Sequence, residues 1–499
     1  MLVTDEEQPL LRILSSERED VDVDVATQTN TIKEDDVGSQ LLDFEPFDAE
    51  DPRNWPRGFK WGIVLLLALM AFTVTFTCIG VVPIASTIVA DLSGNNPPSR
   101  TTNSALLVTI WELGEAAGPL LIAPLSEVLG RYPVMNVCNT LFICATLLAA
   151  CSQSSLTFIA ARMLTGLAVA SNVLNPAIIG DVFEREERGS AMSLIMLAPL
   201  VGGACGPAIA GAIAQTWGWR LVLVIAAALA VACEVLFLCC FRETYKVVIL
   251  KRRGAKRRKG EEEGKRKHDN ARKLWGSITR PFAVLFGSSV LLLLSLFASV
   301  AFSYFYVISV SLPGILVGKY GFSPAQTGSA FISFSIGSFC SVLVCNFTLD
   351  RIYIQLRGPG DATGKPEYRL PLSIIGAVLL PFSVVAYGWI AEYRLSVWLL
   401  LASVSVMGFT LLLTIIPLSA YVVDACGMYS ASAMTGVIVT RCLMGTFLPL
   451  AAGPLAEHLG YGWGLSCLGA LCLCLAVIPI LILRRGERWR QRSEFTRDS

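Results

Sequence analysis

Two carboxylates stand three residues apart inside an apolar stretch of the chain. Glu112 and Glu115 lie in the segment LLVTIWELGEAAGPLLIAPLSEVLGR, residues 106–131. A spacing of three places both side chains on one face of a helix. Ionisable groups in hydrocarbon are costly, so they usually face a partner or a water-filled cavity. The pair therefore predicts a site in which one carboxylate is anchored, while the other exchanges a proton or meets a cationic substrate.

The composition predicts that these carboxylates belong to an integral membrane protein. The chain has 499 residues, of which 54% are hydrophobic and 16% are charged, and its mean hydropathy is +0.60. Soluble domains carry about 25% charged residues. A helix needs about 20 apolar residues to cross a bilayer, and that length selects about twelve segments. They cover residues 61–84, 103–125, 133–151, 156–180, 190–214, 219–241, 282–310, 323–349, 370–390, 395–423, 430–454 and 463–483.

The basic residues between the sixth and seventh segments set the predicted orientation. Residues 242–280 are dense in Lys and Arg, and such loops stay in the cytosol. Counting outward from this loop puts both termini in the cytosol. We therefore expect an all-α membrane protein with two pseudo-symmetric six-helix bundles. The predicted parts are a disordered N-terminal tail, the first bundle, a basic linker, the second bundle and a C-terminal tail, at residues 1–58, 59–241, 242–280, 281–484 and 485–499.

Depth in the bilayer gives each glutamate a predicted role. The second segment should run inward and end near Glu127, so Glu115 lies about 18 Å and Glu112 about 22 Å from that end. Both depths fall near the middle of a hydrocarbon core about 30 Å thick. Arg162 should lie about 10 Å below the outer surface. We expect one glutamate to pair with Arg162. The better match in depth makes this Glu112 and leaves Glu115 to carry the exchanged proton.

Other polar and aromatic residues in the spans are weaker candidates for the proton or substrate site. Asn172 and Asn175 are amides in an apolar run, where amides line a cavity or join helices. Tyr304 and Tyr306 belong to the sequence FSYFY. These rings offer stacking to a flat ligand, although ordinary packing explains them equally well.

The remaining reactive side chains predict no metal, no cofactor and no enzymatic site. Asp424 and Arg441 flank the tenth and eleventh segments, and we expect them to pair across the second bundle. The two histidines, His268 and His458, lie far apart and outside a metal-ligand spacing. The fifteen cysteines lie within or at the ends of apolar runs, which is typical of small helix residues rather than of disulfides.

Residues that recur at matching places in the two halves predict a moving interface. A Gly-Pro pair stands in the fifth segment and again in the eleventh, and such residues allow close packing and bending. At the inner gate we expect Arg131 to lie near Asp181 or Glu184. The residues predicted to act in gating are Glu127, Gly130, Arg131, Asp181, Arg188, Gly206, Pro207, Asp350 and Arg351.

Seven motifs stand in order along the chain. They are DPRNWP at 51–56, SRTTNSALLVTIWELGEAAGPLLIAPLSEVLGR at 99–131, RMLTG at 162–166, GACGPAIAGAIAQTWGWR at 203–220, RETY at 242–245, PEYRLP at 366–371 and YVVDA at 421–425. The set resembles the major facilitator superfamily, and within it the fungal twelve-helix drug:proton antiporter group that also includes polyamine exporters. The resemblance implies a central site near the bilayer midplane that opens alternately to the two sides.

The resemblance also implies a function, which is proton-coupled efflux of a small organic compound such as a drug, toxin or secondary metabolite. Proton-coupled uptake of a nutrient or polyamine and a non-transporting membrane receptor are the alternatives. The net charge of +1 indicates no nucleic-acid partner. The expected partners are the substrate, protons and the lipid bilayer. We expect a monomer in the plasma membrane, with the vacuolar membrane as the alternative location.

The orientation can be tested at the basic linker. A protease site inserted near Arg258 should be cut only from the cytosolic side of sealed vesicles, because the dense positive charge keeps this loop inside. Immunoblotting of the fragments gives the measurement. Cleavage from the outside alone would contradict either the number of spans or their orientation.

Overall fold

The described part of the protein consists of helices and their connections. The computed structural model describes residues 48, 50–93, 100–184, 187–250, 278–357 and 365–496. Its elements are η1 Pro52–Asn54, α3 Arg57–Ile79, η2 Val82–Ile84, α4 Ala85–Ser93, α5 Arg100–Leu129, α6 Arg131–Ala150, α7 Ser155–Leu167, α8 Ser171–Val182, α9 Arg188–Trp217, α10 Trp219–Cys240, α13 Ser289–Tyr320, α14 Pro324–Arg357, η3 Pro366–Arg369, α15 Leu370–Glu392, α16 Val397–Cys426, η4 Gly427–Tyr429, α17 Ser430–Leu475 and α18 Val477–Arg490. The expected all-α class is confirmed for these residues.

Within these described residues, eleven helical stretches are long and apolar enough to cross a membrane. The last of them, Ser430–Arg490, is 61 residues long, about twice what one crossing requires. Gly460 divides it, because its φ of 78° and ψ of 167° lie outside the helical region. Only glycine adopts such angles readily. Counting both parts gives the twelve crossings that the sequence predicts.

The seventh crossing differs from the expected span at 282–310. A short helix covers Ile278–Gly287, and Ser288 is extended with a φ of −123° and a ψ of 113°. The long helix α13 then begins at Ser289 and continues to Tyr320. It ends where Gly321 takes a left-handed φ of 69°, a usual helix stop. The apolar run alone does not mark this shift, because both short and long helices are apolar.

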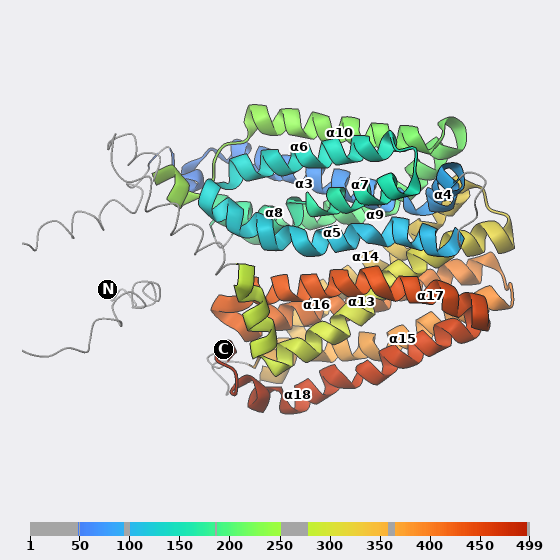
Figure 1. Ribbon diagram of the computed structural model, residues 1–499. Helices are drawn as coiled ribbons and strands as arrows, with labels where there is room; N and C mark the ends of the chain where they lie inside the picture. The colour runs from blue at the N-terminus through green and yellow to red at the C-terminus, as the bar shows by residue number, and fades with distance from the viewer. Residues whose placement is uncertain are drawn as a thin grey trace, which may run out of the picture. The chain divides into compact units, whose positions relative to one another are not determined.

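The helices form two halves, with α3 to α10 in the first half and α13 to α18 in the second (Figure 1). In the first half, a side chain at Gly166 of α7 would collide with the carbonyl oxygen of Trp111 in α5. In the second half, a side chain at Gly408 of α16 would collide with the carbonyl oxygen of Phe334 in α14. The second and fourth crossings therefore pack backbone to backbone, as do the eighth and tenth. Equivalent helices use the same packing device in both halves.

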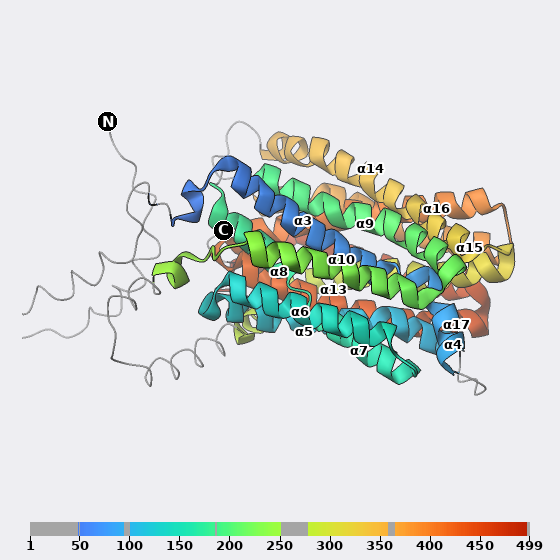
Figure 2. The same ribbon diagram turned by 90° about the horizontal axis from the view of Figure 1, so that it is seen from above.

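Two pairs of helices join the halves. Helices α9 and α14 lie side by side (Figure 2), and a side chain at Gly328 would collide with the carbonyl oxygen of Pro207. Gly206 instead faces Phe76 of α3, within the first half. Helices α5 and α17 form the second pair, where the Thr446 hydroxyl approaches the carbonyl oxygen of Thr109 at 3.4 Å. The predicted interface residues Gly206 and Pro207 thus lie on different faces of α9.

The last described residues fold back onto the end of the second half that the sequence predicts to be cytosolic. Helix α18 continues to Arg490, past the predicted boundary at residue 484. The Arg490 guanidinium donates to the Glu367 carboxylate at 3.0 Å, and both side chains are almost fully buried. Phe495 packs edge-on against Tyr429, with ring centroids 5.3 Å apart. The PEYRLP motif therefore ties the last helix to the rest of its half.

Removing the buried carboxylate should destabilise the protein. Glu367→Ala removes the carboxylate that pairs with the buried Arg490 charge, and removing one member of a buried ion pair costs about 3–5 kcal/mol. Lys365→Ala is the matched control, because Lys365 forms an exposed ion pair with Glu487, which lies on the same helix as Arg490. Thermal unfolding of the detergent-solubilised protein should show a lower melting temperature for Glu367→Ala and little change for Lys365→Ala. Equal decreases in the melting temperature of both variants would contradict the structural role of the buried pair.

Candidate functional site

Glu112 of α5 lies at the interface between the halves. Its side chain is buried, and the Tyr306 hydroxyl of α13 donates to Oε1 at 2.5 Å. The other oxygen, Oε2, has no hydrogen-bond partner among the described residues and lies close to Gly445, where an added Cβ would stand 3.2 Å away. In the described part of the chain, no Lys or Arg forms an ion pair with this carboxylate. A hydrogen bond from the other half is its main polar contact.

Glu115 lies one turn further along the same face, with a richer set of donors. Asn172 donates its amide to Oε1 at 2.7 Å, and the indole N–H of Trp111 donates to Oε2 at 3.2 Å. The Arg441 guanidinium of α17 lies 4.0 Å from Oε1. Asn172 stands in the first turn of α8, just after the break between α7 and α8. Broken helices near the midplane are typical of binding sites in transporters.

Arg441 links this carboxylate to an aromatic cluster of the second half. Its guanidinium stacks on the Phe302 ring at 4.2 Å. Phe302 in turn belongs to a cluster with Phe305, Tyr306 and Phe334, whose neighbouring centroids lie 4.9–6.2 Å apart. The expected pair between Asp424 and Arg441 is therefore wrong. Arg441 lies at the interface between the halves, where a cation balances the charge of Glu115.

Arg162 does not pair with either glutamate, so the pairing predicted from depth is wrong. Its guanidinium donates to the carbonyl oxygens of Thr77 and Cys78, each at 3.0 Å. It also stacks on the Trp111 ring at 4.7 Å. The predicted depth does bring Arg162 near the site, but the guanidinium points toward α3. It holds the backbone of the first crossing instead of a carboxylate.

Two further candidates, Tyr304 and Asn175, and the buried acid Glu234 make no described contact with the other half. The Tyr304 hydroxyl donates to the carbonyl oxygen of Leu468 inside the second half. Asn175 is buried, with its amide oxygen unpartnered among the described residues. Glu234 accepts a hydrogen bond from Asn139 at 2.8 Å between α6 and α10. The Glu234 side chain is buried.

The end of the first half that the sequence predicts to be cytosolic holds a cluster around Arg131. Its guanidinium donates to Asp181 at 3.3 Å, which confirms one of the two partners expected for it. Ser126 and the ring of Tyr245 complete its contacts, at 2.5 Å and 4.7 Å. The Glu243 carboxylate accepts from the Arg131 backbone N–H at 2.8 Å. The RETY motif thus closes this cluster, which sequence reasoning had not connected to Arg131.

Gly130 is required by this arrangement for two reasons. Its φ is 105°, which other residues rarely adopt. An added side chain would also collide with the Glu243 carboxylate.

Arg188 caps the end of α8 by donating to the carbonyl oxygens of Gly180 and Phe183. Glu127 is exposed beside these residues.

The second half carries an analogous cluster, built on a different arginine. Arg369 donates to Asp350 at 2.7 Å and to Asp424 at 2.8 Å. Its guanidinium stacks on the Tyr353 ring at 4.7 Å. The predicted gating residue Arg351 is exposed on α14. Each cluster joins helices of its own half, so neither ties the two halves together.

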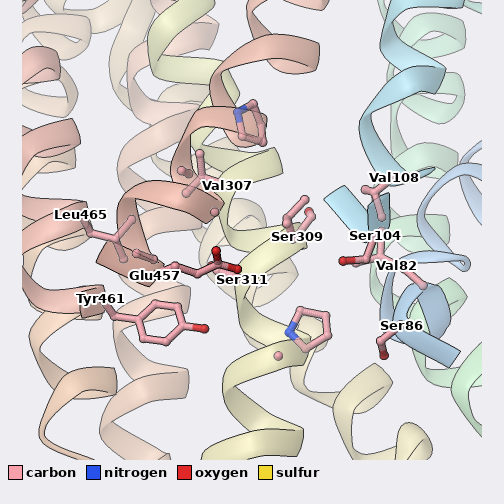
Figure 3. A pocket seen from close by; sticks show the side chains of 18 residues that line it. Val82, Ser86, Ser104, Val108, Val307, Ser309, Ser311, Glu457, Tyr461 and Leu465 are labelled. Atoms are coloured by element: carbon pink, nitrogen blue, oxygen red, sulfur yellow. The ribbon is translucent and has the colours of Figure 1, made fainter. Parts of the chain in front are cut away.

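A cavity of about 320 Å³ lies between the halves on the predicted outer side of Glu112 (Figure 3). It is bounded by η2, α4 and α5 of the first half and by α13 and α17 of the second. Its walls are mostly Val, Ala, Pro and Leu side chains, interrupted by serines. Sequence reasoning missed this cavity, because its lining residues come from five separate elements without a shared motif.

Comparisons with known proteins agree with this architecture. The model of the Major Facilitator Superfamily matches residues 64–449. The efflux pump radE of Floropilus chiversii is 32% identical over 482 residues, which is 95% of this chain and 89% of that protein. The MFS-type transporter penM of Penicillium rubens is 32% identical, covering 91% of this chain and 90% of that one. A crystal structure of a D-xylose–proton symporter has the same fold, with a TM-score of 0.65 at 15% identity, covering 84% of this chain and 97% of its own.

The contacts of Arg162 and Glu112 predict different effects on stability. Arg162→Met removes the donors to two buried carbonyl oxygens, each of which costs about 1–3 kcal/mol when left unpaired. Glu112→Gln keeps an oxygen that accepts from Tyr306, so its melting temperature should stay close to that of the wild type. Thermal unfolding of both purified variants provides the measurement. An equally large decrease in the melting temperature of Glu112→Gln would instead support the pairing of Glu112 with Arg162 that depth predicted.

Proposed function

Because the chain belongs to the Major Facilitator Superfamily, we propose that it exports a small organic compound in exchange for protons. The chain is a multi-pass integral membrane protein and a secondary transporter rather than an enzyme. The names of similar proteins support the direction, since the relative from Floropilus chiversii is called an efflux pump. Two six-helix halves that rock about a central site provide the general mechanism.

Glu112 is the residue that we assign to the coupled proton. It is buried at the interface, and its only hydroxyl or nitrogen donor among the described residues is the Tyr306 hydroxyl. An ionised carboxylate there has no direct ion-pair partner among the described residues, so taking up a proton lowers the cost of burying its charge. Tyr306 belongs to the other half, so any movement that separates the halves breaks its hydrogen bond to this carboxylate. Proton binding and movement therefore act on the same contact.

Glu115 is assigned the structural role that the sequence analysis gave to Glu112. The Trp111 indole and the Asn172 amide donate hydrogen bonds to it, and the Arg441 guanidinium lies 4.0 Å away as an ion-pair partner. Charge-assisted hydrogen bonds of this kind stabilise the ionised carboxylate. The Arg441 contact crosses the interface, so it favours the closed arrangement of the two halves at this depth. The proposed roles of anchor and proton carrier are therefore the reverse of those expected from the sequence, with Glu115 as the anchor and Glu112 as the proton carrier.

Competition at Glu112 explains how export and proton entry are linked. When the halves separate, the Tyr306 hydroxyl leaves the carboxylate. Either a proton or a hydrogen-bond donor of the substrate then satisfies it. Because each weakens binding of the other at the same oxygen atoms, the coupling is reciprocal and favours exchange. Both halves of the site come from one chain, which supports a monomer as the working unit, and export out of the cell supports the plasma membrane.

The proposal predicts that Glu112→Gln separates proton coupling from substrate binding. A transported compound is first identified by growth protection of a yeast strain that lacks its own drug exporters. In proteoliposomes with an imposed pH gradient, Glu112→Gln should accumulate less than about a tenth of the wild-type amount of that compound, because glutamine cannot titrate. It should still catalyse exchange of labelled for unlabelled compound without a gradient.

Glu234→Gln is the matched control, since Glu234 is also a buried acid but contacts only its own half. It should accumulate the compound as the wild type does. Glu115→Gln should reduce both accumulation and exchange, because it loosens the contact with Arg441. Normal gradient-driven accumulation by Glu112→Gln would show that the coupled proton binds elsewhere.

A further inference from the structure

Two adjacent cysteines stand at one end of α10. Cys239 and Cys240 are the last two residues of this helix, and both are free and exposed. Helix α10 is long and apolar enough to cross the membrane, and it lies along the edge of the first half (Figure 1). Exposed side chains on such a helix face lipid. Both thiols are therefore presented to the bilayer rather than to the protein interior.

The two thiols continue rows of exposed apolar side chains along α10. Val231 and Val235 precede Cys239 at intervals of four residues, and Leu236 stands four residues before Cys240. All three apolar side chains are exposed. A spacing of four keeps side chains on one face of a helix. A hydrocarbon chain attached to either sulfur can therefore lie along an apolar surface of the protein.

The residues that follow the cysteines mark the edge of the membrane. Arg242 is exposed two residues after Cys240, and its guanidinium lies 5.4 Å from the centroid of the Phe59 ring. It begins the segment 242–280, which is dense in Lys and Arg, and this predicts that the end of α10 is cytosolic. Both thiols thus stand within about one helical turn of the first charged side chain.

Exposure and position together separate this pair from the other cysteines. Cys426 also stands at the end of a helix that the sequence predicts to be cytosolic, but it is buried. Cys151 is exposed after the opposite end of α6, and Cys144 is exposed about 20 Å from the first residue of that helix. The remaining exposed cysteines lie within the spans, at least ten residues from the charged side chains at the predicted cytosolic end, and are Cys205, Cys340, Cys467 and Cys474.

We propose that Cys239 and Cys240 form a site of S-acylation by a long-chain fatty acid. Exposed cysteines next to the cytosolic end of a membrane helix have the position that this modification requires. The acyl donor is a fatty acyl-coenzyme A. A cysteine sulfur attacks the carbonyl carbon of its thioester, so a new sulfur–acyl bond forms and the bond to the coenzyme A sulfur breaks. The cysteine proton ends on the released coenzyme A thiol, and nothing is oxidised or reduced.

The attached chain anchors a segment that contributes to the Arg131 cluster. Cys240 stands three residues before Glu243, whose carboxylate accepts from the Arg131 backbone N–H at 2.8 Å. Phe241, between them, stacks on Tyr132 with ring centroids 6.2 Å apart. An acyl chain in the bilayer adds apolar burial to this short segment. It therefore holds the start of the basic linker at the membrane surface, where the Glu243 contact forms.

Metabolic labelling of the full chain in yeast tests the proposal. The cells are fed palmitate that carries a terminal alkyne, and the purified protein is coupled to an azide dye. The wild type should carry the dye, and neutral hydroxylamine should release it, because this reagent cleaves thioesters but not amides. Cys239→Ser combined with Cys240→Ser should lower the dye signal to that of protein from unfed cells. Mass spectrometry of the tryptic peptides identifies the acylated cysteine.

Cys144→Ser combined with Cys151→Ser is the matched control, because it also removes two exposed cysteines of the first half. It should keep the wild-type dye signal. Both double variants should elute as the wild type does in gel filtration, since the replaced side chains are exposed. An acylated protein from the same membranes serves as the positive control for labelling.

An unlabelled wild type beside a labelled positive control would overturn the proposal. Dye that survives hydroxylamine, or that remains after both Cys239 and Cys240 are replaced, would overturn it as well. Acylation of Cys151 instead would contradict both the proposal and the predicted orientation. The readout is independent of transport, so it does not depend on the proposed function.

Discussion

A buried charge in a membrane protein must find its partner inside the protein, and this constraint shapes the interface between the two halves. Glu112 and Glu115 lie on the first half, but Tyr306 and Arg441 of the second half supply a donor and a cation. Neither half satisfies both carboxylates alone. The polar contacts that hold the halves together at mid-depth are therefore the same contacts that depend on charge. Under the proposed binding of a proton to Glu112, a change of proton occupancy would act directly on the interface, without a relay through other residues.

Packing within each half differs in kind from packing between the halves. Gly166 and Gly408 bring backbones into direct contact inside the two halves, and the clusters of Arg131 and Arg369 tie helix ends of one half together. Such contacts leave little freedom for internal rearrangement. The two halves are therefore stiff bodies, joined by a smaller set of polar, apolar and glycine-mediated contacts. Rocking of these bodies changes the interface while it preserves each bundle.

Sequence patterns predicted the features that depend on one segment or on neighbouring segments. Hydropathy predicted the crossings. The short distance along the chain between the second and fourth crossings correctly predicted that Arg131 lies near Asp181. Depth brought Arg162 close to the site, but depth does not say which way a side chain points around its helix. Arg441 was assigned to the wrong acid because its partner lies in the other half. Contacts that cross between halves carry no local signal in a single sequence.

The charges at mid-depth also limit which compounds can exchange with a proton. Two carboxylates and two guanidinium groups, from Glu112, Glu115, Arg162 and Arg441, balance when all are ionised. The site then has the same net charge with a proton bound as with a monovalent cation bound. A neutral donor does not change the net charge of the site. An anion would instead favour simultaneous binding of a proton, because the proton offsets its charge in a poorly polarisable environment. Such joint binding corresponds to symport. For cationic or neutral donor compounds, the charges at mid-depth are therefore consistent with the proposed exchange.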